Sequence, residues 1–418
     1  MVFDRPQAGE NAILVQMALP GIDPEKALAE FKELAFSAHA NILDCLLGAR
    51  VNPDAKFYIG KGKAEELATL VKTYDAELVL INHELSPSQE RNLERVLQCR
   101  VVGRSGLILD IFARRALTFE GKLQVELAQL QYLSTRLIRG WTHLERQKGG
   151  IGLRGPGETQ LETDRRLLRA RIKFINKRLE KVRCTREQNR QSRRKENRAT
   201  VSLVGYTNAG KSSLFNALTG ESIYVADQLF ATLDPTMRQL ELPGASATLL
   251  TDTVGFIRDL PHHLIEAFRA TLEETEQADL LLHVIDSSDP NWSDMVIAVQ
   301  KVLTDLKVHQ TPTVQVFNKI DLLDNEPARI DYSEDGDKVW VSASSGVGID
   351  LLKEFIAFKL NGAVLIEEIL LKGTQAKLRA QLYALNAVLG ESINQEGDWL
   401  LKIRISQAQK QKLFSAEF

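Results

Sequence analysis

The sequence predicts an α/β protein in which two regions of mainly parallel sheet lie on either side of a pair of long helices. Three observations predict this class. Short apolar runs alternate with helical patterns in the first quarter of the chain and again in its second half, which is typical of βαβ units. Between those regions, leucine and isoleucine recur every seven residues. The composition is 44% apolar and 26% charged, as in globular proteins, and 418 residues suffice for two to four domains.

The composition also excludes several classes of protein. No run of about 18 apolar residues occurs, so we expect no stable membrane insertion. The first residues show no basic flank before an apolar core, so we expect no secretory signal. Cys45, Cys99 and Cys184 are far apart and fit neither a disulfide framework nor a metal-ligand spacing. We therefore expect a cytoplasmic protein that is monomeric when free, and peripheral association with a membrane stays open.

Residues 1–113 are expected to form a small α/β domain. The apolar runs Asn11–Leu19 and Glu77–Ile81 predict strands, and Pro24–Ala38 and Pro87–Leu97 predict helices that begin at a proline. Because strands and helices alternate, the sheet is expected to be mainly parallel.

Residues 114–198 predict an antiparallel helical hairpin. Apolar residues repeat at three-, four- and seven-residue spacings in two blocks, which is the pattern of helices that pack as a coiled coil. They are Leu123, Leu127, Leu130 and Leu137 in the first block, and Leu161, Leu168, Ile172, Ile175, Leu179 and Val182 in the second. Between the blocks, Gly140–Gln160 holds six glycines, which predicts a functional loop.

The hairpin region carries the chain's excess of positive charge. From Arg114 to Arg198 there are 23 basic and 9 acidic residues, a net charge of +14, whereas the whole chain has a net charge of -2 and the remainder therefore -16. A solvated coiled coil would mix the two signs, so we favour contact with nucleic-acid phosphates that weakens with salt. The loop adds aromatic and cationic side chains suited to folded RNA. These are Trp141, His143, Arg146, Lys148 and Arg154.

Two further domains are expected after the hairpin. Residues 199–360 predict a second α/β domain, in which Thr200–Val204, Leu280–Asp286 and Val314–Phe317 are the clearest strands. Residues 361–418 predict a small α+β domain with the strand-like runs VLIEEILL and WLLKIRIS.

The strongest motif is the phosphate loop GYTNAGKS, Gly205–Ser212, which lies between a predicted strand and a predicted helix. Its glycines let backbone N–H groups and the helix N-terminus approach phosphate oxygens. Lys211 is expected to neutralise the β- and γ-phosphates and Ser212 to bind Mg²⁺. The expected nucleotide contacts here are Gly205, Tyr206, Thr207, Asn208, Ala209, Gly210, Lys211, Ser212 and Ser213.

Two downstream segments would complete the phosphate end of the site. Asp252 in DTVG is expected to hold Mg²⁺ through water, and the N–H of Gly255 to contact the γ-phosphate. Thr232 in FATLDPT would bind Mg²⁺, so its segment would order with GTP and loosen with GDP; an ordinary loop threonine is the alternative. We expect catalytic roles for Lys211, Thr232 and Gly255. The other expected contacts are Phe230, Ala231, Thr253 and Val254.

Two motifs further along the chain would select guanine. Asp321 in the motif NKID can accept hydrogen bonds from guanine N1–H and N2–H₂, whereas adenine would leave the carboxylate unpaired. Lys319 would pack across the base, and Asn318 would tie the motif to the phosphate loop. Backbone N–H groups would reach guanine O6 from Ser342, Ala343 and Ser344.

Together these motifs resemble those of translation-factor-related P-loop GTPases. The block GGIGLRGPGETQLETDRR (Gly149–Arg166), with FATLDPT and DTVGFIRDLP, closely resembles the HflX family of the Obg–HflX superfamily, over about Phe57 to Leu360. The resemblance implies a Mg²⁺-dependent GTPase that binds GTP and GDP and associates with the ribosome, mainly the 50S subunit and its rRNA. It also implies that the glycine-rich loop reaches rRNA, and that stalled or idle ribosomes are split or recycled.

Two residues bear on the rate of hydrolysis. Phe256 stands where Ras-like GTPases have a water-orienting glutamine, so we expect slow intrinsic hydrolysis that a partner, a rearranged backbone or a bound ion completes. Asn208 stands where related potassium-activated GTPases have an asparagine that helps to hold K⁺. The resemblance therefore implies K⁺ near Asn208, and an asparagine that only stabilises the loop is the alternative.

The N-terminal stretch Tyr58–Lys63 leaves alternatives open. It is rich in glycine and lysine and opens a helix, but lacks phosphate-loop spacing. It could bind a second nucleotide, contact an RNA backbone or simply begin the helix. Two other functions follow: an RNA-remodelling ATPase driven by the N-terminal domain, and a non-catalytic GTP/GDP-gated scaffold.

Overall fold

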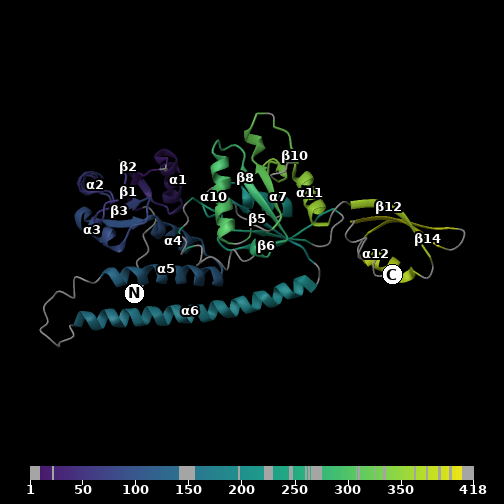
Figure 1. Cartoon of the computed structure of the whole chain (residues 1–418), viewed down its shortest axis with the longest axis horizontal. Helices are drawn as coiled ribbons and strands as arrows, with labels where there is room; N and C mark the ends of the chain where they lie inside the picture. The colour runs from purple at the N-terminus through teal and green to yellow at the C-terminus, as the bar shows by residue number, and fades with distance from the viewer. Residues whose placement is uncertain are drawn as a thin grey trace. The chain divides into compact units, whose positions relative to one another are not determined.

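A computed structural model of the chain forms two compact units (Figure 1). Unit 1 comprises Met1–Thr185, Ala226–Asp234 and Leu260–Ala270, and unit 2 comprises Arg186–Val225, Pro235–Asp259 and Thr271–Phe418. The structure describes residues 10–20, 23–140, 156–195, 198–220, 229–243, 248–258, 261, 264, 275–306, 308, 311–324, 326–332, 336–361, 364–372, 375–384, 387–394 and 398–406. Across these ranges, no helix combines the length and hydropathy needed to cross a membrane.

The N-terminal part of unit 1 is a parallel four-stranded sheet in the order β2-β1-β3-β4. Its strands are β1 (Asn11–Ala18), β2 (Asn41–Ala49), β3 (Leu78–Ile81) and β4 (Arg100–Gly103). Its helices are α1 (Pro24–Ser37), α2 (Lys61–Tyr74), α3 (Pro87–Leu97) and α4 (Arg104–Arg115). The predicted parallel sheet is confirmed, and α4 runs past the boundary expected at residue 113.

Local signals account for where these helices begin. Asp23 accepts hydrogen bonds from the N–H groups of Glu25 and Lys26 and so caps α1, which has proline at its first position. Ser86 and Gln89 form a reciprocal capping box at the start of α3. These caps satisfy N–H groups that the helices cannot pair internally.

The predicted hairpin is present as α5 (Phe119–Gly140) and α6 (Pro156–Lys195), and its residues up to Thr185 belong to unit 1. Its apolar seam centres on Leu123, Leu127 and Ile175. An ion pair between Arg171 and Glu126, with an N–O distance of 2.7 Å, joins the helices beside the seam. The loop was predicted to span Gly140–Gln160, and its predicted C-terminal bound is wrong. α6 already begins at Pro156, because proline is favoured in the first turn of a helix. Residues 141–155 lie outside the described residues.

Unit 2 contains a seven-stranded sheet in the order β10-β11-β9-β8-β5-β7-β6, parallel apart from its two outermost strands. The strands are β5 (Thr200–Gly205), β6 (Thr236–Leu240), β7 (Thr248–Asp252), β8 (Leu280–Asp286), β9 (Thr313–Asn318), β10 (Arg329–Asp331) and β11 (Lys338–Trp340). The helices are α7 (Lys211–Thr219), α10 (Trp292–Asp305), the short 3₁₀ helix η1 (Ile320–Leu322) and α11 (Ile349–Asn361).

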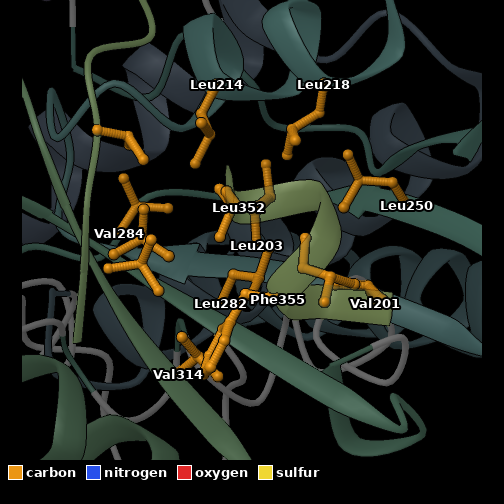
Figure 2. Close-up of a cluster of buried hydrophobic side chains, with 14 of the residues drawn as sticks. Val201, Leu203, Leu214, Leu218, Leu250, Leu282, Val284, Val314, Leu352 and Phe355 are labelled. Carbon is orange, nitrogen blue, oxygen red and sulfur yellow. The ribbon is translucent and has the colours of Figure 1, made fainter. Parts of the chain in front are cut away.

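Figure 2 shows the core that supports this sheet. Leu203, Leu282 and Val284 project from the central strands toward Leu214 of α7 and Leu352 of α11, and all five are fully buried. Because these central strands are buried on both faces, they read as continuous apolar runs in the sequence.

A small α+β region follows, as predicted. It is an antiparallel sheet in the order β12-β14-β13, with β12 (Val364–Leu371), β13 (Val388–Ile393), β14 (Trp399–Ser406) and one helix, α12 (Ala376–Ala384). Leu378 and Leu382 of α12 pack on Leu371, Leu401 and Ile403 of the sheet.

Candidate nucleotide-binding site

The phosphate loop connects β5 to α7 at the carboxyl edge of the central parallel strands. Gly210 ends the loop with φ +85°, and a Cβ atom there would lie 2.3 Å from Nδ2 of Asn318, so the position favours glycine. Lys211 begins α7, and its N-cap, Gly210, has no side chain with which to cap the helix. This combination of a tight loop and a helix start is the arrangement that binds phosphate oxygens.

Lys211, the first residue of α7, follows this loop and is buried. Its Nζ donates a hydrogen bond to the carbonyl oxygen of Tyr206, at 2.6 Å. Burial lowers the pKa of Lys211 to about 8, although the nearby carboxylate of Asp252 acts in the opposite direction. A Cβ atom on Gly255 would lie 3.0 Å from this Nζ, so Gly255 leaves the space that the ammonium group uses.

Two oxygen-bearing side chains meet beside Lys211. The hydroxyl of Ser212, in the first turn of α7, donates to Oδ2 of Asp252 at 2.8 Å. Asp252 ends β7, which neighbours β5, and is only 3% exposed. A carboxylate and a hydroxyl this close form an oxygen donor set that fits Mg²⁺.

The DTVG segment packs closely against the phosphate loop. The N–H of Thr207 donates to the carbonyl oxygen of Phe256 at 2.8 Å, and the N–H of Phe256 donates to that of Gly205 at 3.1 Å. Thr253 and Val254 are buried, and Thr253 donates through its hydroxyl to the backbone of β5. The Phe256 side chain is itself only 2% exposed, so it belongs to the core of this region.

Asn318 joins three loops at the same edge of the sheet. Its Nδ2 donates to the carbonyl oxygen of Ala209 in the phosphate loop at 3.0 Å. Its Oδ1 accepts from the N–H of Ala343 at 2.9 Å. The motifs NKID and SAS, separated in sequence, are thus fixed to the phosphate loop by one buried amide.

Asp321 and the serines of the SAS motif also lie together. Ser342 donates its hydroxyl to Oδ1 of Asp321 at 2.5 Å, and Ser344 donates to Oδ2 at 2.9 Å. These hydrogen bonds, that of Ser342 first, lower the pKa of Asp321 and keep its carboxylate charged. A charged acceptor at this position suits the two donors on the edge of guanine.

The segment that contains Thr232 belongs to unit 1. Phe230 is 2% exposed, and its ring meets that of Phe112 edge-on at a centroid distance of 4.6 Å. Two residues after Thr232, Asp234 accepts from the N–H groups of Leu117 and Thr118, each at 2.8 Å. Phe230, Ala231 and Thr232 therefore lie in a segment that packs on the N-terminal sheet region and on the start of α5.

The hairpin presents a basic surface along α6. Arg166, Arg169, Lys173 and Lys177 are exposed on this helix. The five aromatic and cationic loop residues from Trp141 to Arg154 lie outside the described residues. The described part of the predicted RNA-facing surface therefore lies on α6.

Sequence reasoning missed three residues near the site. Asp286 forms an ion pair with Lys319, Asp234 accepts from the N–H groups of the two residues before α5, and the N–H of Arg258 donates to the hydroxyl of Tyr206 at 2.9 Å. Asp286 ends a strong strand pattern, but its place beside NKID depends on the order of the strands in the sheet and therefore had no local signal. Asp234 had none, because its partners are more than 100 positions away in sequence.

The fold and these motifs define the class of protein. A phosphate loop between β5 and α7, an Asp-Ser pair suited to Mg²⁺, and a guanine-type NKID motif on one sheet edge are the features of a P-loop GTPase.

Comparison with known proteins identifies the family within that class. Three family models match consecutive parts of the chain: GTP-binding GTPase N-terminal over residues 25–113, GTP-binding GTPase middle region over 115–193, and 50S ribosome-binding GTPase over 200–319. GTPase HflX of Escherichia coli K12 is 53% identical over 97% of this chain and 95% of its own length. GTPase HflX of Magnetococcus marinus is 46% identical over 92% of this chain and 90% of its own length. The chain belongs to the HflX family of GTPases, which confirms the resemblance seen in the sequence.

Among solved structures, the chain is similar to a GTP-binding protein from Sulfolobus solfataricus in complex with GDP. The two are 24% identical, with a TM-score of 0.45 over 84% of this chain and 98% of the other. Membership of the HflX family makes the protein a GTPase, and its residues 200–319 match the model of 50S ribosome-binding GTPases.

Proposed function

We propose that the protein is a Mg²⁺-dependent GTPase switch that binds the 50S subunit and its rRNA and splits or recycles stalled or idle ribosomes. The observation that carries this proposal is the exposed row of Arg and Lys along α6 in a chain whose remainder is acidic. A surface of this kind binds a polyanion through many phosphate contacts. Within a ribosome-binding family, rRNA is the polyanion that best explains it.

In this proposal each motif residue has a defined task. Lys211 neutralises charge on the β- and γ-phosphates, and Gly255 contributes a backbone N–H to the γ-phosphate. Asp321 and Lys319 hold the guanine base. Ser212, Asp252 and Thr232 would hold Mg²⁺, which, when bound, neutralises the phosphate charge that develops during hydrolysis.

The proposal includes slow hydrolysis by the protein alone. Phe256 is buried and apolar, so it cannot orient the attacking water as a glutamine would. The ribosome, or K⁺ held near Asn208, would complete the site. Asn208 has φ +61°, a left-handed conformation that asparagine tolerates. Equal turnover in Na⁺ and K⁺ would leave Asn208 with a role in loop structure alone.

The decisive measurement is GTP turnover with and without purified 50S subunits, in the wild type and in Lys211→Ala. We expect turnover to rise with 50S subunits, to fall at high salt, and to be lost in the variant. Light scattering of 70S ribosomes then tests splitting, which we expect to require GTP. Absence of any stimulation would reject the ribosomal role but not nucleotide binding.

The alternative functions have distinct outcomes. RNA unwinding driven by ATP that survives Lys211→Ala would favour an N-terminal ATPase, with Tyr58–Lys63 as its nucleotide contact. A non-catalytic scaffold has no support, because the chain belongs to a family of GTPases.

A further inference from the structure

The loop after β8 makes a set of contacts that no sequence motif predicts. β8 and β9 are parallel neighbours, and Asp286, the last residue of β8, pairs in register with Asn318, the last residue of β9. The loop that follows β8 therefore lies beside the NKID motif at the carboxyl edge of the sheet.

Asp286 holds the side chain of Lys319. Its Oδ2 is 2.7 Å from Nζ of Lys319, and the two side chains are 18% and 25% exposed. Its Oδ1 accepts from the N–H of Ser288 at 3.0 Å and from the hydroxyl of Ser288 at 2.6 Å. Because both carboxylate oxygens have partners, the direction in which Asp286 faces Lys319 is fixed.

Ser287 holds the backbone at the same place. Both its N–H and its hydroxyl donate to the carbonyl oxygen of Asn318, at 2.9 and 2.7 Å. Lys319 follows with φ +68°, a left-handed conformation that is unfavourable for a lysine and persists only where surrounding contacts impose it. The loop Asp286–Ser288 supplies such contacts on both sides of this peptide.

The consequence concerns the long alkyl chain of Lys319. A Cβ atom on Gly210 would lie 3.9 Å from Cε of Lys319, so the lysine chain runs past the phosphate loop toward Asp286. A free lysine side chain samples many rotamers, and a bound base that packs against it must restrict them. Asp286 restricts them before the nucleotide arrives, which lowers the entropy cost of binding.

We propose that Asp286 is a positioning residue for guanine: it acts through Lys319 and sets the lifetime of bound GTP and GDP without touching either. This inference rests on the proposed role of NKID in base recognition. It predicts that removing the Asp286 carboxylate accelerates nucleotide release, while the choice of guanine over other bases stays with Asp321.

The test is a double-mutant cycle on GDP dissociation, measured by stopped-flow fluorescence with a labelled GDP. Asp286→Asn is expected to raise the dissociation rate about tenfold, the effect of losing one charge-assisted hydrogen bond. In a Lys319→Met background, Asp286→Asn is expected to change the rate less than twofold. Asp289→Asn is the matched control, because Asp289 lies in the same loop but accepts from the N–H of Asn291.

Three outcomes have separate meanings. An unchanged rate in Asp286→Asn overturns the inference. An equal effect of Asp286→Asn with and without Lys319 also overturns it, because the role would then be loop structure alone. Failure of the underlying role of NKID shows elsewhere: Asp321→Asn would then leave the preference for GDP over xanthosine diphosphate unchanged.

Discussion

The lowered pKa of Lys211 predicts how the affinity for GDP depends on pH. Its pKa is about 8 in the nucleotide-free site because burial disfavours the charged ammonium group. Phosphate oxygens beside Nζ favour the charged form, and we expect bound GDP to return the pKa to about 10.5, the ordinary value. Above pH 8, Lys211 is mostly neutral in the free protein but charged in the complex, so GDP binding requires the uptake of a proton. The affinity for GDP therefore falls as pH rises.

The size of the effect follows from these two values. At pH 9, one unit above the lowered pKa, about one Lys211 in eleven is protonated before binding. Protonating it costs about 1.4 kcal/mol, so GDP is expected to bind about tenfold more weakly at pH 9 than at pH 7. His283, whose pKa is lowered to about 4 by burial and by Lys211, stays neutral over this range and does not contribute.

Calorimetry measures both quantities. GDP titrations at pH 7 and pH 9, in buffers of different ionisation enthalpy, give the affinity and the number of protons taken up, which we expect to be close to one at pH 9. Lys211→Ala is the control. It is expected to bind GDP more weakly, and only the ionisation of the nucleotide itself should make its affinity depend on pH. The same pH dependence in both proteins would refute the reasoning.

The linked effect on stability has the opposite sign. The unfolded chain keeps the ordinary lysine pKa and binds more protons than the folded, nucleotide-free protein between pH 8 and about 10.5. The contribution of Lys211 to the free energy of unfolding therefore increases as pH rises through this window. Thermal unfolding of wild type relative to Lys211→Ala, each without nucleotide, measures this contribution; a relative stability of the wild type that falls with pH would contradict it.

The remaining predictions concern packing and local structure. Asp234→Ala removes the acceptor for the N–H groups of Leu117 and Thr118 and is expected to cost about 1–2 kcal/mol locally, so hydrogen exchange at these amides accelerates about 5- to 30-fold, while Asp234→Asn shows a smaller change. Ile175→Ala empties the centre of the hairpin seam and is expected to cost about 2–4 kcal/mol, visible as faster exchange in α6 up to Thr185 but not in the seven-stranded sheet of unit 2. Phe256→Gln places an amide in an apolar core position and is expected to destabilise unit 2 by about 1–3 kcal/mol without raising intrinsic GTP turnover; a stable, faster variant would contradict this.

Much of the fold was predictable because its signals are local. The helix α3 occupies the predicted range Pro87–Leu97, since a capping box and a proline define its start within four residues. β8 occupies the predicted range Leu280–Asp286, since a strand buried on both faces leaves a continuous apolar run. β2 escaped prediction because Asn41–Ala49 is only partly buried and carries a polar Asp44 and Gly48 in its interior.

In the candidate site too, some residues were predictable from local sequence signals and others were not. The phosphate loop and NKID are short motifs with their own chemistry, so the residues that would touch nucleotide could be named from the sequence. The residues that hold those motifs could not. Asp286 reaches Lys319 across 33 positions, and the hydroxyl of Tyr206 accepts from Arg258 across 52. Only the strand order of the sheet brings such pairs together, and strand order is not written in any local pattern.

The hairpin shows why these long-range contacts matter for function. Among the described residues, its seam has three buried side chains, of which that of Ile175 is fully buried, so packing between these parts of α5 and α6 alone gives the hairpin little stability. α5 is held in addition by contacts near its two ends: Asp234 accepts from the N–H groups of the two residues that precede it, and Arg136 forms an ion pair with Glu90 of α3, with an N–O distance of 2.8 Å. Of these two contacts, the one made by Asp234 comes from the segment expected to respond to GTP. If GTP changes that segment as expected, the two hydrogen bonds that hold the residues before α5 are the contacts through which α5, the helix packed against the basic α6, would be affected.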